Sequence, residues 1–267
     1  MAYSPLQLAP KYGRYLMTAA NGKGHGIHSP FVFDMVTRVF GDKKVYPAYG
    51  AIESLRRHLS ADRDTTIVID DLGAGTGGAA TQQRRLSSIA RTALKPPKFG
   101  QLFFRLAQYY KPSTILELGT SLGITTAYLA SGNPSASVVT CEGAPAIASV
   151  ARRTFDTLGL SRIRLVEGNF DDTLGSVLSA LSSLDFAYID GNHRLEPTLR
   201  YYRQMQPRLH NESILVFDDI HWSLEMEEAW AAVKADPMVT CTVDLFFIGL
   251  VFFRREFHTP QHFTIRF

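Results

Sequence analysis

A carboxylate and two glycines follow an apolar run in the segment STILELGTSLGITTAYLA, residues 113–130. The run before Gly119 has the continuous apolar character of a strand buried on both faces, and the residues after Gly123 continue at helical spacing. Gly119 permits a tight turn, and Gly123 leaves the backbone at the helix N-terminus open to a ligand. The order is G-x-x-x-G rather than G-x-G-x-x-G, and Glu117 precedes it where a pyrophosphate would be repelled. The pattern therefore favours a nucleotide-type pocket for a ligand that carries an amino group.

A second carboxylate, Glu142, ends the next apolar run at residues 137–142. At a strand end beside the glycine turn, a carboxylate can accept hydrogen bonds from both ribose hydroxyls of an adenosine. The alternative is an exposed acid that serves solubility. The preceding glycine turn favours the ribose role.

Three further acids end two later runs, Asp190 at residues 185–190 and the pair Asp218 and Asp219 at residues 213–219. Ligands of an open α/β sheet bind at the carboxyl edge of its strands, so we expect these acids to converge there. Three neighbouring carboxylates repel each other unless they are protonated or bridged by a cation, and their hard oxygen atoms suit Mg²⁺, Mn²⁺ or Ca²⁺. The alternative is that they are ordinary loop acids paired with arginines or with His221.

A second acid-and-glycine segment, TTIVIDDLGAGTGG at residues 65–78, imitates the first pattern with Asp71 before its glycines. A nucleotide-binding unit needs a helix, a second strand and an acid about 20 residues further on. Residues 81–97 supply a polar helix and then prolines. We therefore interpret the GAGTGG loop as structural or as part of the substrate mouth, with closure over the cofactor as the lesser alternative.

These residues are carried by a regular alternation of apolar runs and helical patterns. Such alternation specifies a parallel sheet covered on both faces by right-handed crossovers. The last two strands are separated only by a tight turn near Ile248 and Gly249, so they form an antiparallel hairpin. The fold class is α/β, with a Rossmann-like, seven-stranded, mostly parallel sheet and an antiparallel C-terminal hairpin. Strands are expected at residues 114–118, 137–142, 163–167, 185–190, 213–218, 239–247 and 250–255, with helices at 123–131, 144–158, 172–182, 197–209 and 223–235.

Residues 1–97 are predicted to form a mainly helical N-terminal segment on the substrate side, a lid or packing arm. Its clearest helix spans residues 30–40, where Ser29 can cap and Pro30 suits the first helical position. The domain that carries the candidate site is predicted at residues 98–267.

The composition of the chain limits which other classes of function it could have. With 267 residues, 45% of them hydrophobic and 20% charged, the chain can bury one large core. The formal charge is +3 and the arginine pairs are scattered, so we expect no nucleic-acid partner. The two cysteines, Cys141 and Cys241, lack C-x-x-C spacing, which argues against a zinc site and suits a reducing cytoplasm. No apolar run is long enough to span a bilayer, and a homodimer is left open.

The segment from Glu117 to Gly123 resembles the first motif of the class I S-adenosylmethionine (SAM) methyltransferases, E/D-x-G-x-x-x-G. The resemblance covers residues 98–267 and implies a SAM-binding methyltransferase domain. It also implies an adenine site at Asn169 and Phe170, although Asp171 or Asp172 there could equally cap the following helix. The implied cofactor-binding residues are Glu117, Gly119, Thr120, Ser121, Gly123, Glu142, Gly143, Asn169, Phe170 and Asp190.

The acids resemble those of the cation-dependent O-methyltransferases of the catechol and caffeoyl-CoA type. That pattern has an acid after the fourth strand, and Asp190 matches it. After the fifth strand it has an acid followed by an asparagine; Asp218 matches the acid, and Asp219 stands in place of the asparagine. The resemblance implies a divalent cation held by these three acids. The catalytic lysine of that family lies three residues after the first acid, where this chain has His193, which would then remove the acceptor's proton.

The leading hypothesis is transfer of the SAM methyl group to a hydroxyl oxygen of a small molecule with the help of a divalent cation. An NAD(P)-linked oxidoreductase is disfavoured because G-x-G-x-x-G is missing. A third hypothesis is a catalytically inactive binding module that has kept the fold.

Overall fold

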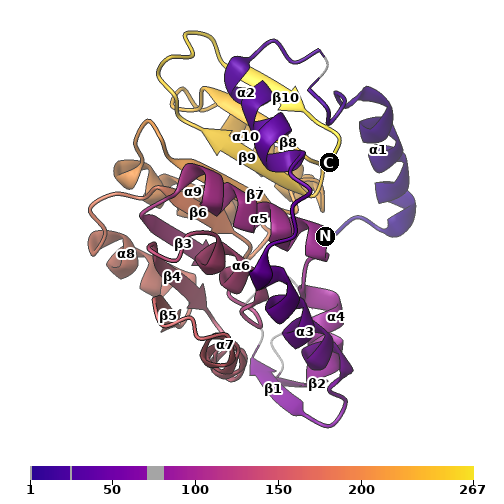
Figure 1. The fold of residues 1–267 in the computed structure, drawn as a ribbon, viewed down its shortest axis with the longest axis vertical. Coiled ribbons are helices and arrows are strands. Elements are labelled where there is room, and N and C mark those ends of the chain that lie inside the picture. The colour runs from indigo at the N-terminus through magenta and orange to yellow at the C-terminus, as the bar shows by residue number, and fades with distance from the viewer. Residues whose placement is uncertain (1, 25, 71–80) are drawn as a thin grey trace. The chain divides into compact units, whose positions relative to one another are not determined.

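A computed structural model describes residues 2–24, 26–70 and 81–267 (Figure 1). The chain divides into two compact units. The first unit comprises Met1–Asp42 and Leu178–Phe267, and the second comprises Lys43–Val177. The GAGTGG loop lies outside the described residues, so its role stays a prediction. In the part of the chain that is described, no helix is long and apolar enough to cross a membrane.

The second unit contains three parallel strands in the order β3-β4-β5 and a separate antiparallel hairpin, β1-β2. The three parallel strands lie where the apolar runs predict them. Its elements are α3 (Pro47–Ala61), β1 (Thr66–Asp70), β2 (Thr81–Arg85), α4 (Leu86–Ala93), α5 (Pro97–Tyr110), β3 (Thr114–Leu118), α6 (Ile124–Gly132), β4 (Ser137–Glu142), α7 (Pro145–Thr157), β5 (Ile163–Glu167) and most of α8 (Phe170–Ser179).

The hairpin corrects one expectation. Residues 81–85 were expected to begin a polar helix, but they form β2, which pairs with β1 from Thr66↔Arg85 to Asp70↔Thr81. The sequence TQQRR has little intrinsic strand preference, so pairing with the apolar β1 overrides its local propensity. The helix begins only at Leu86.

The first unit contains five strands in the order β10-β8-β9-β7-β6. Strands β6 and β7 are parallel, β9 is antiparallel to both β7 and β8, and β10 is parallel to β8. The predicted C-terminal hairpin is confirmed, with its turn at residues 245–247 rather than at Ile248 and Gly249, and β10 is an additional strand. The elements are α1 (Pro5–Thr18), α2 (Pro30–Met35), a π-helical turn (Val36–Phe40), β6 (Phe186–Ile189), α9 (Leu195–Met205), a 3₁₀ turn (Gln206–Arg208), β7 (Ile214–Asp218), α10 (Leu224–Lys234), β8 (Cys241–Asp244), β9 (Ile248–Phe252) and β10 (Gln261–Thr264).

Each unit has a buried free cysteine, Cys141 on β4 and Cys241 on β8. Strand β7 is buried along its whole length, as a strand covered on both faces requires. Together the strands and helices give the α/β class with a mostly parallel sheet that the sequence predicts.

Helices α5 and α6 of the second unit pack closely because glycines lie at their contact. A Cβ added at Gly100 of α5 would collide with the ring of Tyr128, and one added at Gly132 of α6 would collide with the backbone oxygen of Phe104. A backbone oxygen cannot move away as a flexible side chain can. The end of α6 therefore has no room for a larger residue.

We expect Gly132→Ala to lower the free energy of unfolding by about 1–3 kcal/mol, the usual cost of overpacking. Urea unfolding monitored by circular dichroism measures the change. Gly175 of α8 is the matched control, since nothing lies within 4 Å of a Cβ built there. Gly175→Ala should be neutral or slightly stabilising, and an equal loss in both variants would contradict the packing argument.

Candidate active site

The glycine turn between β3 and α6 is tied to the neighbouring strand β4. The backbone N–H groups of Gly119 and Thr120 both donate to the carbonyl oxygen of Cys141, at 3.0 and 3.1 Å. The backbone φ angles of Gly119, Ser121 and Gly123 are 99°, 47° and 81°, all in the left-handed region. The turn is thus held from outside in a conformation that favours glycine at two of its positions.

Gly123 is required for a reason that the sequence did not show. A Cβ at this position would lie 2.7 Å from Cε1 of Phe155 and 3.3 Å from Cα of Ala151, both on α7. Close packing against α7 and the positive φ therefore account for this glycine, independently of any ligand.

Glu142, at the end of β4, reaches the turn with its side chain. Its Oε2 accepts the backbone N–H of Ser121 at 2.9 Å, and its Oε1 accepts the backbone N–H of Ala144 at 3.0 Å. Each oxygen of an ionised carboxylate has a second lone pair, and Glu142 is only half-buried. The predicted ribose acceptor is therefore fixed beside the turn. Gly143, the next residue, is also half-buried.

Glu117 lies deeper than the sequence indicates. Its side chain is 0% exposed, and its Oε2 accepts hydrogen bonds from the hydroxyls of Thr126 and Thr140, the latter at 2.6 Å. Because Thr140 gives its one proton to Glu117, Thr120 must be the donor in the 2.6 Å contact between the Thr120 and Thr140 hydroxyls. This buried network joins β3, β4, the turn and α6. Sequence reasoning missed the two threonines, which no spacing rule singles out.

Asn169 and Phe170 stand at the start of α8. The side-chain oxygen of Asn169 accepts the backbone N–H of Asp171 at 3.1 Å, and its backbone oxygen accepts the N–H groups of Asp172 and Thr173. Asn169 therefore caps the helix, the role that Asp171 or Asp172 could have taken. Phe170 is half-buried.

In the first unit, three of the predicted site residues meet. One ligand atom each from Asp190, His193 and Asp218 lies within 4.8 Å of the others, and Nε2 of His193 is 3.3 Å from Oδ1 of Asp190. This group contains His193 where the sequence analysis expected Asp219. Two carboxylates at these separations fit a single divalent cation. The imidazole beside them can either join the ligands, which suits transition metals, or act as a base.

The loops that carry this group contain unusual backbone conformations. Asn192, His193 and Asp219 have φ angles of 68°, 40° and 52°, which non-glycine residues rarely adopt. The Asn192 side chain donates to the hydroxyl of Tyr201 at 3.3 Å, and the backbone N–H of Asp219 donates to the oxygen of Phe247 at 2.7 Å. Such backbone conformations are common at functional sites, where contacts with the surrounding structure hold them in place.

Tyr188, on the strand that leads to Asp190, donates its hydroxyl proton to Oδ2 of that residue at 3.0 Å. Burial, and then the negative charges of Asp190, Asp218 and Asp219, raise the pKa of Tyr188 well above its ordinary value. The phenol therefore stays protonated and orients Asp190 as a fixed donor. Trp222, whose ring centroid is 5.7 Å from that of His193, is a second neighbour that sequence reasoning missed.

His221 belongs to a separate cluster. Its Nδ1 lies 3.1 Å from Oε1 of Glu227 and its Nε2 lies 2.8 Å from Oδ2 of Asp244. Glu227 also accepts hydrogen bonds from Tyr3 and Lys11 of the N-terminal segment. Both nitrogens of His221 are engaged in this way, so its ring does not serve Asp218 or Asp219.

The pKa of His221 is raised: burial lowers it, but the hydrogen bonds and charges of Asp244 and Glu227 outweigh burial. A raised pKa in the folded state stabilises the protein fully below the unfolded pKa of about 6.5, and this stabilisation is lost as pH rises through the folded pKa. We therefore expect His221→Gln to cost more unfolding free energy at pH 6 than at pH 9. Urea unfolding at both pH values measures this, with His258→Gln, an exposed histidine, as control. A pH-independent difference for His221→Gln would contradict the charged cluster.

Comparison with known proteins agrees with this geometry. A family model described as a methyltransferase domain matches residues 116–220, which include the glycine turn, Glu142 and the Asp190 group. A catechol O-methyltransferase from Niastella koreensis is 30% identical over 126 residues, 46% of this chain and 56% of that protein. The chain thus spans about half the length of this curated relative.

Three solved structures share the fold. The first is a methyltransferase from Podospora anserina bound to S-adenosylhomocysteine (SAH), with a TM-score of 0.59 and 14% identity, covering 95% of this chain and 98% of that one. The second is an O-methyltransferase from Bacillus cereus in complex with SAH, with a TM-score of 0.55 and 17% identity, covering 79% of this chain and 92% of that one. The third is the O-methyltransferase TomG from Streptomyces achromogenes in complex with SAM, with a TM-score of 0.55 and 15% identity, covering 82% of this chain and 96% of that one. The resemblance to class I SAM methyltransferases and the predicted fold class are confirmed.

Proposed function

We propose that this chain, whose residues 116–220 match a methyltransferase domain, transfers the methyl group of SAM to a hydroxyl oxygen of a small molecule. One observation carries the proposal: the carboxylate of Glu142 is held 2.9 Å from the backbone nitrogen of Ser121, so an acceptor for ribose hydroxyls stands at the glycine turn. The O-methyltransferases named above support transfer to oxygen.

The cofactor contacts follow from the positions of the side chains. Glu142 accepts the ribose hydroxyls, and the turn offers backbone rather than side-chain contacts at its glycines. Glu117, buried under the turn, supports it through Thr126 and Thr140. We assign the SAM site to Glu117, Gly119, Thr120, Ser121, Gly123, Glu142, Gly143, Asn169, Phe170 and Asp190, with Glu117 acting through the turn because it is fully buried.

His193 removes the proton from the acceptor. A phenol with a pKa near 10 is mostly protonated at neutral pH, so its oxygen needs a base before it attacks the methyl group. The carboxylate of Asp190, 3.3 Å from Nε2, stabilises the imidazolium that forms. The proton lost by the acceptor thus remains on His193 while the oxygen takes the methyl group and SAH leaves.

Asp190 and Asp218 hold a divalent cation, Mg²⁺, Mn²⁺ or Ca²⁺, and Asp219 is proposed as a further ligand although it lies outside the group that the structure brings together. A cation bound there would stabilise the negative charge on the acceptor oxygen. The chain's own part is to keep the two carboxylates together at two strand ends, with the His193 imidazole beside them as the base.

A thermal-shift assay with SAM, SAH and NAD(P) tests the cofactor. A ligand that binds only the folded state stabilises it by about 2.7 kcal/mol at a hundred times its Kd. We expect SAM and SAH to raise the unfolding temperature and NAD(P) to leave it unchanged. A shift with NAD(P) alone would favour the oxidoreductase, and a shift with SAM without turnover of any hydroxylated acceptor would favour an inactive binding module.

The acceptor is proposed to be a small hydroxylated molecule, and the enzyme to act in the cytoplasm. A homodimer also stays a proposal, which light scattering would test.

A further inference from the structure

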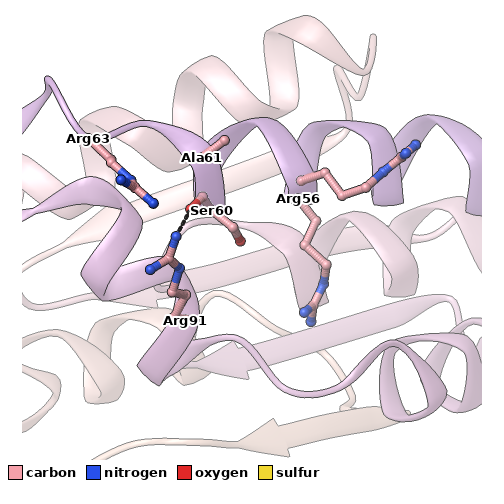
Figure 2. Close-up of a pocket in the computed structure, with 6 residues that line it drawn as sticks. Arg56, Ser60, Ala61, Arg63 and Arg91 are labelled. Carbon is pink, nitrogen blue, oxygen red and sulfur yellow. Dashed lines mark hydrogen bonds between the residues drawn. The ribbon is translucent and has the colours of Figure 1, made fainter.

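A basic pocket of about 600 Å³ lies in the second unit, at the end of α3 and against α4. Four of the six residues that line it are arginines and none is acidic. Figure 2 shows Arg63 and Arg91 both reaching toward Ser60, with the Arg91 side chain bonded to the Ser60 backbone oxygen at 3.2 Å. The lining residues are Arg56, Arg57, Ser60, Ala61, Arg63 and Arg91.

The positive charge of this basic pocket is only partly balanced. Within the described part of the chain, Glu53 is the one carboxylate in an ion pair with a lining arginine, 3.4 Å from Nε of Arg56. Glu53 also accepts the hydroxyl proton of Tyr128 at 2.8 Å, so its charge is shared. The nearby carboxylate of Asp62 is turned to the backbone N–H groups of Asp64 and Thr65, at 3.1 and 2.9 Å.

Helix structure explains only part of this cluster. The C-terminal end of a helix carries roughly half a negative charge, which favours cations there, and Arg91 caps one free carbonyl of α3. Half a charge does not offset the four guanidinium groups of the lining residues. An anion bound in the pocket would balance part of their positive charge.

We propose that the basic pocket binds a small polyanion with two or more linked phosphates. The forked donors of arginine match phosphate oxygens in pairs. The six lining residues include no aromatic side chain on which a base could stack, which disfavours single-stranded nucleic acid. This site is independent of the SAM site proposed above.

The test is calorimetric titration of the full chain with tripolyphosphate at low ionic strength. Arg63→Gln combined with Arg91→Gln is expected to raise Kd at least about tenfold, because two charge-assisted contacts are lost. Since Arg91 also bonds α3, the single variant Arg63→Gln is measured too and is expected to weaken binding in the same direction. Arg152→Gln with Arg153→Gln on α7 removes the same charge outside the pocket and should change Kd less than about twofold.

Three outcomes would overturn the proposal. They are no saturable binding of tripolyphosphate, an equal loss in pocket and control variants, and tighter binding of an oligonucleotide or a nucleoside triphosphate than of tripolyphosphate. SAM affinity measured on the same samples should be unchanged by all the arginine substitutions, so a failure here is distinguishable from a failure of the SAM site.

Discussion

Replacing Asp218 by Ala is expected to lower kcat/KM for a phenolic acceptor by a factor on the order of 10³. A bound cation supplies several kcal/mol of stabilisation to the developing oxyanion, and each 1.4 kcal/mol corresponds to a tenfold change in rate. Chelator treatment of the wild type should reproduce the loss, and adding back Mg²⁺, Mn²⁺ or Ca²⁺ should restore only the wild type. The measurement is a methyl-transfer assay with SAM.

Because Asp218 is 1% exposed, its removal could also disturb folding. Circular dichroism and SAM titration of the Asp218→Ala protein separate the two effects, since SAM affinity should survive. Asp219→Asn is the matched control: asparagine keeps an oxygen ligand at this position and is usual there in the related enzymes, so its activity should be close to wild type. Full activity of the wild type in chelator would remove the cation from the proposal.

The second large effect is expected from Glu142→Ala. Loss of charge-assisted hydrogen bonds to the ribose should weaken SAM binding by about 1.5–3 kcal/mol, a factor of roughly ten to more than a hundred in Kd. Isothermal titration calorimetry with SAH measures it directly.

Glu167 provides the control for Glu142. It ends the adjacent strand β5, pairs in register with Glu142, and carries the same charge. Its carboxylate is bound by Arg152 rather than by the turn. Glu167→Ala should therefore leave SAH affinity within about twofold, and an unchanged affinity in Glu142→Ala would refute the ribose assignment.

The sequence predicts the central strands well because each carries a continuous apolar run. Ile115, Leu116 and Leu118 of β3 are all fully buried, as such a run requires. The prediction from sequence fails at β2, where the strand is polar and forms through its pairing with β1. It also fails at β10, an edge strand whose four residues alternate between half-buried and exposed. Strands of this kind are decided by their neighbours, which local preference does not record.

The candidate site shows the same division. The apolar runs placed Asp190 and Asp218 at strand ends, and the resemblance to the cation-dependent O-methyltransferases pointed to His193. The structure brings all three together. That His193 rather than Asp219 completes the group depends on backbone angles in the two loops, which no motif encodes. The buried hydroxyls of Thr126 and Thr140 were invisible for a related reason, since their role arises only from the crossing of α6 over the strands.

The two cysteines have a practical consequence. Burial raises the pKa of the Cys141 and Cys241 thiols to about 12, with the charge of Glu117 adding to the effect at Cys141. A thiol reacts with alkylating reagents as the thiolate, so both groups are silent in the folded protein at neutral pH. Since one thiol lies in each compact unit, the rate at which each is alkylated reports how often that unit opens, and the chain carries its own pair of stability probes.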